Sequence, residues 1–204
     1  MKEKYIKDLQ EIKEMMNRSS RFISLSGLAG ITTGIIALIG AYIAHHTVFT
    51  GQDYLSHKAV DLPSEKLTLI LLIATSTILL AAAAAIYFTT RETKLRNQPT
   101  WDHQTKRLLI NLAIPLVAGG ILCLMLVTRG YVGMLAPITL IFYGMALVTA
   151  SKYTLNELRS LGLIEIMLGL MAFQFIGQGL LFWAFGFGIL HIVYGIIIQR
   201  KNKQ

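Results

Sequence analysis

The chain has 204 residues, of which 54% are apolar and only 15% are charged, whereas an average soluble domain carries roughly 25% charged residues. This composition excludes an ordinary soluble globular protein. The net charge of +8 is divided among several short segments rather than gathered on one domain, so it does not indicate a nucleic-acid-binding protein. Cys123 is the single cysteine, which excludes a disulfide or a cysteine-based metal site within one chain.

The first element that the sequence predicts is a short amphipathic helix within residues 1–20. Tyr5, Leu9, Ile12 and Met16 recur at spacings of 4, 3 and 4, which places them on one helix face. Charged side chains occupy much of the opposite face. Three hypotheses fit this pattern: the helix lies on the inner leaflet of a membrane, it forms a short coiled coil, or it binds a cytoplasmic protein partner.

Residues 21–204 are predicted to form a bundle of six transmembrane helices. Six apolar runs each approach or exceed the roughly 17 to 25 residues that span a bilayer as a helix. They cover residues 22–44, 67–89, 108–127, 131–150, 161–178 and 180–198. No Lys, Arg or Asp falls inside these runs, and Glu165 is their only acid. The predicted fold class is therefore an all-α membrane protein with no sizeable soluble domain.

The distribution of Lys and Arg predicts that both termini are cytoplasmic. The two termini and the second and fourth connections carry 16 of these residues, and the opposite side carries only Lys58, Lys66 and Arg129. Such a bias marks the cytoplasmic side, and it also predicts contact with anionic lipid there. The layout resembles that of small bacterial inner-membrane proteins, so the expected localisation is the bacterial inner (plasma) membrane.

The connection from residue 45 to residue 66 holds four candidate metal ligands, His45, His46, Asp53 and His57. Imidazole and carboxylate groups bind divalent cations, and the connection is long enough to bring them together. Their spacing matches no specific ligand pattern. We therefore expect neither a metal nor a cofactor.

Small residues and a proline mark the first and third predicted spans. Ser26, Gly30 and Gly34 recur every four residues, which allows a close helix contact within one chain or between two copies. In the third span, Pro115 cannot donate a backbone hydrogen bond to the carbonyl of Asn111. That carbonyl and the Asn111 amide are available either for packing or for a bound solute.

The last two spans contain the acid and the imidazole that lie at membrane depth, Glu165 and His191. An antiparallel hairpin that turns near Gln178 places these two side chains opposite each other. A polar group in hydrocarbon needs a partner, so we expect them to meet. The same register pairs small residues of the two helices, Gly162 with Gly195, Gly169 with Gly188 and Ala172 with Ala184.

Five polar side chains fall in one layer near the cytoplasmic face when depth is counted at about 1.5 Å per residue. These candidate ligand-binding or proton-binding residues are Glu165, His191, Asn111, Tyr143 and Tyr194. An acid beside an imidazole in a membrane can carry a proton, and it can equally fix the register of two helices. The sequence leaves both roles open.

The sequence favours a transporter of a small solute or ion, with a cytoplasmic-side polar cavity and a proton-linked Glu165 and His191 pair. Six helices divide into two triplets of inverted orientation, as in many secondary carriers, and a homodimer or other homo-oligomer is expected. The alternative is a non-catalytic membrane-embedded regulator or assembly subunit that docks a cytoplasmic partner through its N-terminal helix. An enzyme is disfavoured, because the sequence has no paired acids, no His-x-x-x-His, no Gly-x-Ser-x-Gly and no phosphate-binding loop.

Overall fold

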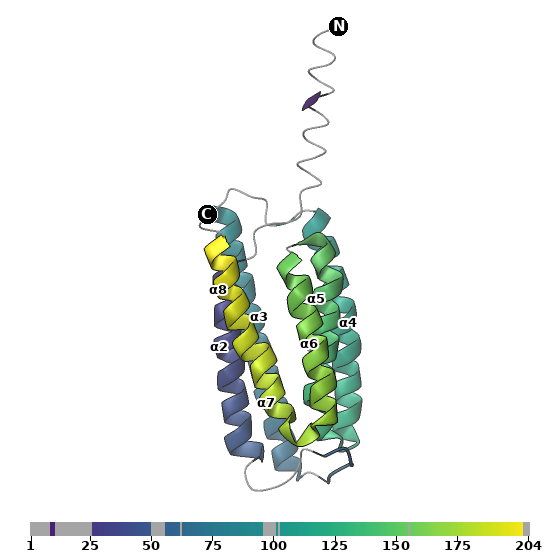
Figure 1. Ribbon diagram of the computed structural model, residues 1–204. Helices are drawn as coiled ribbons and strands as arrows, with labels where there is room; N and C mark the ends of the chain where they lie inside the picture. The colour runs from purple at the N-terminus through teal and green to yellow at the C-terminus, as the bar shows by residue number, and fades with distance from the viewer. Residues whose placement is uncertain are drawn as a thin grey trace.

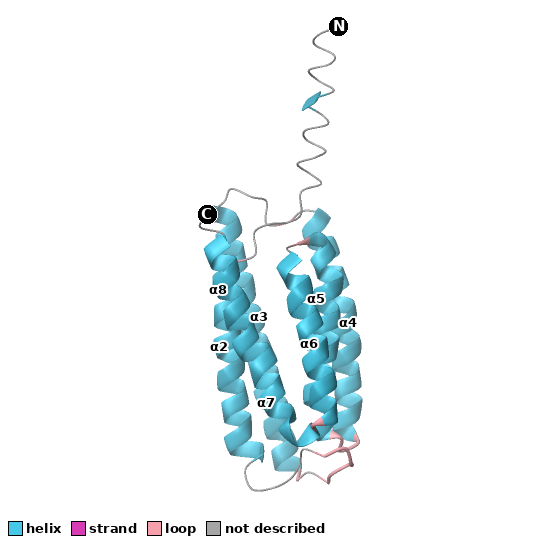
Figure 2. Cartoon of the chain, in the orientation of Figure 1, coloured by secondary structure: helices cyan, strands magenta, loops and turns pink. Residues whose placement is uncertain are grey.

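The computed structural model describes residues 9–10, 26–49, 56–61, 63–95, 101, 103–154 and 156–201. Over these ranges the chain is helical and has no strand (Figures 1 and 2). Almost all of the amphipathic helix predicted within residues 1–20 lies outside the described residues, and so does Asp53.

Six helices run up and down the described part of the bundle (Figure 1). They are α2 (Gly27–Ala44) with its π-helical extension η1 (His45–Phe49), α3 (Ser64–Leu95), α4 (His103–Thr128), α5 (Leu135–Ala150), α6 (Asn156–Gln174), and a last helix made of α7 (Gly179–Trp183), the π-helical η5 (Ala184–Leu190) and α8 (His191–Lys201). Three 3-10 turns complete the described elements, η2 (Val132–Met134), η3 (Ser151–Tyr153) and η4 (Ile176–Gln178).

Five of the six helices are long and apolar enough to cross a membrane. The sixth, α6, has 19 residues but includes Glu157, Arg159 and Glu165. The predicted all-α fold with six helices is thus confirmed. The two longest helices, α3 and α4, continue past their apolar runs into polar residues, because a helix need not end where the hydrocarbon ends.

The helices form two groups of three. The first group consists of α2, α3 and α8, and the second consists of α4, α5 and α6 (Figure 1). The last helix joins them, since α7 contacts α5 and α6 whereas η5 and α8 lie against α2. The groups therefore differ from the two sequential triplets that the sequence suggested. We call the end where α2 begins and α8 ends the terminal end of the bundle.

Glycines set the closest contacts of the first group. A Cβ added to Gly34 of α2 would lie 2.6 Å from the carbonyl oxygen of Gly188, and one added to Gly30 would lie 3.0 Å from the Cα of Gly195. Helices can approach this closely only where side chains are absent. The small-residue row of α2 therefore makes its contact within the chain, with η5 and α8.

The glycines of α6 face α5 and not α8. A Cβ on Gly162 would lie 2.6 Å from the carbonyl oxygen of Gly144, and one on Gly169 would lie 2.6 Å from the side chain of Ile141. The predicted pairing of Gly162 with Gly195 and of Gly169 with Gly188 is therefore wrong. The glycines of α6 allow its close contact with α5, whereas Gly188 and Gly195 of the last helix allow its close contact with α2. The contact between α6 and α8 is made by larger side chains.

Residues 56–61 tie the two groups together at the end opposite the terminal end. The Val60 N–H donates a hydrogen bond to the carbonyl of Gly130, with a nitrogen-to-oxygen distance of 3.0 Å. Gly130 has a φ of +79°, a conformation that glycine adopts without strain. A ring nitrogen of His57 lies 2.8 Å from the carbonyl oxygen of Phe173, the next to last residue of α6. The connection between α2 and α3 thus crosses onto the second group.

Replacing Gly34 with alanine is expected to lower the free energy of unfolding by about 1–3 kcal/mol, because the new methyl group overlaps backbone that cannot move without displacing η5. Denaturant unfolding in detergent measures this change. Gly120→Ala on α4 is the matched control, since nothing lies within 4 Å of its added Cβ, and this variant should be as stable as the parent or slightly more stable. Equal losses in both variants would contradict the close approach of α2 and η5.

Candidate functional site

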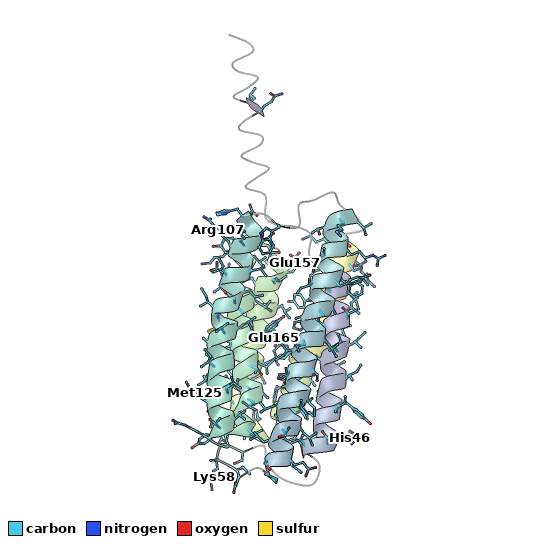
Figure 3. All side chains as sticks on the ribbon, turned by 180° about the vertical axis from the view of Figure 1, so that it is seen from behind. His46, Lys58, Arg107, Met125, Glu157 and Glu165 are labelled. Carbon is cyan, nitrogen blue, oxygen red and sulfur yellow. The ribbon has the colours of Figure 1, made fainter. Side chains whose placement is uncertain are left out.

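Glu165 is a fully buried acid at the centre of α6. It is the tenth of the 19 residues of this helix, and its exposed fraction is 0%. Figure 3 shows it midway along the bundle. Gly186 of η5 gives the carboxylate its room, because a Cβ at this position would lie 2.5 Å from Oε2 of Glu165 and 2.7 Å from the side chain of Leu140. Any larger residue at 186 would displace the carboxylate.

His191 is the nearest polar side chain to this acid. Its Nδ1 lies 3.6 Å from Oε1 of Glu165, so the predicted meeting of acid and imidazole is confirmed. The same nitrogen lies 3.0 Å from the carbonyl oxygen of Gly186. Since a carbonyl can only accept, Nδ1 carries a hydrogen and donates it to Gly186. A separation of 3.6 Å is too long for a hydrogen bond, so the imidazole and the carboxylate interact electrostatically.

Within the described part of the chain, the carboxylate of Glu165 has no hydrogen-bond partner. Among the described residues, neither Oε1 nor Oε2 accepts or donates a hydrogen bond. Buried polar atoms are nearly always paired, and an unpaired one calls for an explanation. A bound proton, a water molecule or an ion would supply the missing interaction.

Tyr143 of α5 completes a chain of three polar side chains. Its hydroxyl oxygen lies 2.7 Å from Nε2 of His191. With the hydrogen on Nδ1, a neutral imidazole leaves Nε2 as an acceptor, and the Tyr143 hydroxyl donates to it. The order Tyr143, His191, Glu165 thus links α5, α8 and α6.

Aromatic rings enclose the imidazole. Phe187 stacks on His191 with ring centroids 5.9 Å apart, and it lies 4.8 Å from the rings of both Tyr143 and Trp183. Sequence reasoning missed Phe187, Trp183 and Gly186. The spacing of 183, 187 and 191 by four residues, which places three rings on one helix face, is the signal that could have revealed the first two.

The helix is widened where it passes this site. Residues 184–190 form the π-helical η5, which ends immediately before His191. π-helical turns are rare and frequently occur at functional sites. Here η5 carries Gly186, whose carbonyl accepts a hydrogen bond from Nδ1 of His191. It is also the stretch from which the last helix begins to pack closely against α2.

Asn111 lies in a separate environment. Its Nδ2 donates to the carbonyl of Arg107 at 2.8 Å, within its own helix. Its backbone carbonyl, which Pro115 leaves without a helical partner, lies 3.0 Å from the hydroxyl oxygen of Thr149 on α5. The predicted free carbonyl is thus confirmed, and the second group uses it for packing. The structure does not bring Asn111 to Glu165.

Tyr194 lies on α8, closer to the terminal end than His191. It lies against a cluster of buried apolar residues, which are Leu147, Leu158, Leu161 and Ile198. Of the five predicted polar residues, the structure therefore brings three together, Glu165, His191 and Tyr143.

The four weak metal candidates do not form a described site. The rings of His45 and His46 lie with centroids 5.4 Å apart, whereas His57 contacts α6. Asp53 lies outside the described residues. In the described part of the chain, no group of three or more His, Cys, Asp or Glu side chains could hold a metal ion.

A second polar contact joins α6 and α8 at the terminal end of the bundle. The Lys201 ammonium donates a hydrogen bond to Oε1 of Glu157, with a nitrogen-to-oxygen distance of 2.5 Å. This bond lowers the pKa of Glu157 below its usual value. Together with the Glu165 and His191 pair, it fixes the register of the two helices.

No protein family model matches the chain, and no curated protein or solved structure is detectably similar to it. The chemistry of the site therefore has to be argued from its own geometry.

Tyr143→Phe is expected to lower the free energy of unfolding by about 1–2 kcal/mol, because the mutation leaves Nε2 of a buried imidazole without its hydrogen-bond donor. Thermal unfolding in detergent provides the measurement. Tyr42→Phe is the control, since Tyr42 is 66% exposed, and it should leave the midpoint unchanged. The hydrogen bond is refuted if Tyr143→Phe is as stable as the parent.

The pair of Glu157 and Lys201 predicts a dependence of stability on pH. Because the folded-state pKa of Glu157 is lowered, its contribution is present above the unfolded pKa of about 4.3 and is lost as the pH falls through the folded value. The side chains are 23% and 63% exposed, so we expect only about 0.5 kcal/mol. Lys201→Gln should remove this contribution and weaken its pH dependence. Lys152→Gln, which removes a charge at the same end, should do neither.

Proposed function

We propose that the chain is an integral membrane protein with six transmembrane helices, and that it carries a small solute or ion in a process linked to proton binding by Glu165 and His191. Five helices meet the requirements of length and hydropathy. Glu157 and Arg159 lie at the cytoplasmic edge of α6, and residues 160–178, which cover the rest of α6 and η4, extend about 28 Å, close to the roughly 30 Å of the hydrocarbon core. Glu165 in this segment faces protein rather than lipid, as intramembrane acids do.

The proposed orientation places the terminal end in the cytoplasm. Successive helices alternate in direction, so α3 and α5 end, and α4 and α6 begin, at the terminal end (Figure 1). The sequence around these helix ends is rich in Lys and Arg, which favours the cytoplasmic side. The bacterial inner membrane is the membrane that we propose for it.

The position of the acid and the imidazole carries the proposal. Glu165 belongs to the second group and His191 to the helix that packs in the first group, so their contact crosses from one group to the other. Away from water, the pair is tolerated when it is neutral overall, either as two uncharged groups or as two opposite charges. Adding or removing one proton leaves an uncompensated buried charge. A pair that is neutral overall therefore favours the contact between the two groups of helices, and a pair with a net charge opposes it.

The last helix offers a place at which such a movement can be absorbed. Its first part contacts α5 and α6, its last part contacts α2, and the π-helical η5 lies between them. Irregular turns of this kind are suited to act as hinges. The hydrogen bonds of residues 56–61 hold the groups together at the opposite end. At the terminal end, the bond of Lys201 to Glu157 and the packing of Ile198 against α5 and α6 also join α8 to the second group. The movement that we propose, an opening toward the cytoplasm, would break these contacts.

The regulator hypothesis depends on the predicted N-terminal helix, which lies almost entirely outside the described residues. No contact in the described part of the chain favours it over transport.

Glu165→Gln is expected to abolish proton-coupled transport, because the amide cannot exchange a proton. In proteoliposomes loaded with a pH-sensitive dye, a panel of small cations and amino acids is tested for the ability to drive proton movement. A solute that drives proton movement in the parent should do so at least about a hundredfold less in Glu165→Gln, within the range found for positioned proton-transfer groups. Glu157→Gln, which alters the acid at the terminal end, should retain proton movement.

A distance measurement tests the same proposal without a known solute. Spin labels at Lys152→Cys and Arg200→Cys, in a Cys123→Ala background, report the separation of the second group from α8. The distance should change with pH in the parent and stay constant in Glu165→Gln. A distance that is independent of pH in the parent, together with no solute-driven proton movement, removes the proton-linked role.

A further inference from the structure

A groove runs along the terminal-end half of α3. Its lining residues recur at helical spacing and thus share one face of this helix. They are Ala83, Ile86, Tyr87, Thr90, Arg91 and Lys94. All six described lining residues belong to α3, so the groove is shallow and open along its length.

The helix that carries this groove is poorly covered by the rest of the described chain. None of the residues in the most apolar 18-residue stretch of α3 is buried in the described structure, whereas 39% of the residues in the corresponding stretch that contains α5 are buried. Ile86 and Tyr87 are 68% and 64% exposed. The described helices therefore do not fill the groove.

The charge pattern of α3 fixes the depth of the groove in a bilayer. The 24 residues from 67 to 90 carry no charge and extend about 36 Å, slightly more than the roughly 30 Å of the hydrocarbon core. Arg91 and Lys94 then lie in the headgroup layer, and Ala83 and Ile86 lie in the hydrocarbon. Tyr87 lies between them, at the level where tyrosine is enriched in membrane proteins.

We propose that this groove binds an anionic phospholipid of the cytoplasmic leaflet, with its phosphate at Arg91 and Lys94 and an acyl chain along Ala83 and Ile86. Two of the six lining residues are basic and none is acidic, which matches a negative headgroup. A guanidinium binds phosphate oxygens through two parallel hydrogen bonds, and the Thr90 hydroxyl lies beside it in sequence. The inference depends on the proposed membrane orientation and not on the proton-linked role of Glu165.

Quenching of tryptophan fluorescence by brominated lipid tests this site. Tyr87→Trp places a reporter in the groove, in a chain that also carries Trp101→Phe and Trp183→Phe. The protein is reconstituted in phosphatidylcholine that contains increasing fractions of phosphatidylglycerol or phosphatidylcholine brominated at the same chain position. Phosphatidylglycerol should quench at a lower fraction, with an apparent affinity about fivefold higher for each basic residue that contacts it.

Arg91→Gln together with Lys94→Gln should abolish this preference while leaving quenching by phosphatidylcholine unchanged. The control pair, Lys152→Gln with Arg159→Gln, removes the same charge from exposed positions at the same end of the second group and should retain the preference. Equal quenching by both lipids in the parent overturns the proposal, because it shows non-selective boundary lipid. An equal loss in both double variants also overturns it, because the preference then belongs to the surface charge as a whole.

Discussion

The contact between Glu165 and His191 is the constraint on which the arrangement of the bundle depends. Glycine contacts hold α2 to α8 and α5 to α6, and they can form within each group separately. The buried acid cannot remain without a counterpart, and the imidazole that faces it belongs to the other group. The last helix must therefore contact both groups. Its first part, α7, packs against α5 and α6, its later part packs against α2, and the π-helical η5 lies between them, just before the imidazole. The Gly186 carbonyl fixes the hydrogen on Nδ1, and so the imidazole offers its other nitrogen to Tyr143.

Much of the fold could be predicted because the physical signals were local. Apolar runs of spanning length indicated six helices, and a lone acid and a lone imidazole at similar depth indicated a pair. The carbonyl of Asn111 was expected to be free because the chemistry of Pro115 removes its usual partner, and the structure shows Thr149 in that place. Each of these predictions needed only the properties of one segment or of two adjacent ones.

What could not be predicted was the choice among neighbours. A glycine row shows that a helix comes close to another helix but not which one. Gly169 and Gly188 were therefore assigned to each other, although Gly169 faces α5 and Gly188 faces α2. Leu140, which like the carboxylate lies against Gly186, has no polar or sterically unusual feature to mark it in the sequence. The grouping of helices depends on packing between segments distant in the chain, and local patterns do not encode it.

The packing of α2 against η5 and α8 has a consequence for biosynthesis. Within the described bundle, α2 is made before the other five helices, and its glycine row is fitted to η5 and α8, so this part of its surface stays incomplete until residues 184–201 have been made. The helices α4, α5 and α6 are consecutive and can assemble as soon as they are inserted. The closing of η5 and α8 against α2 would follow, and this step brings the imidazole to its acid.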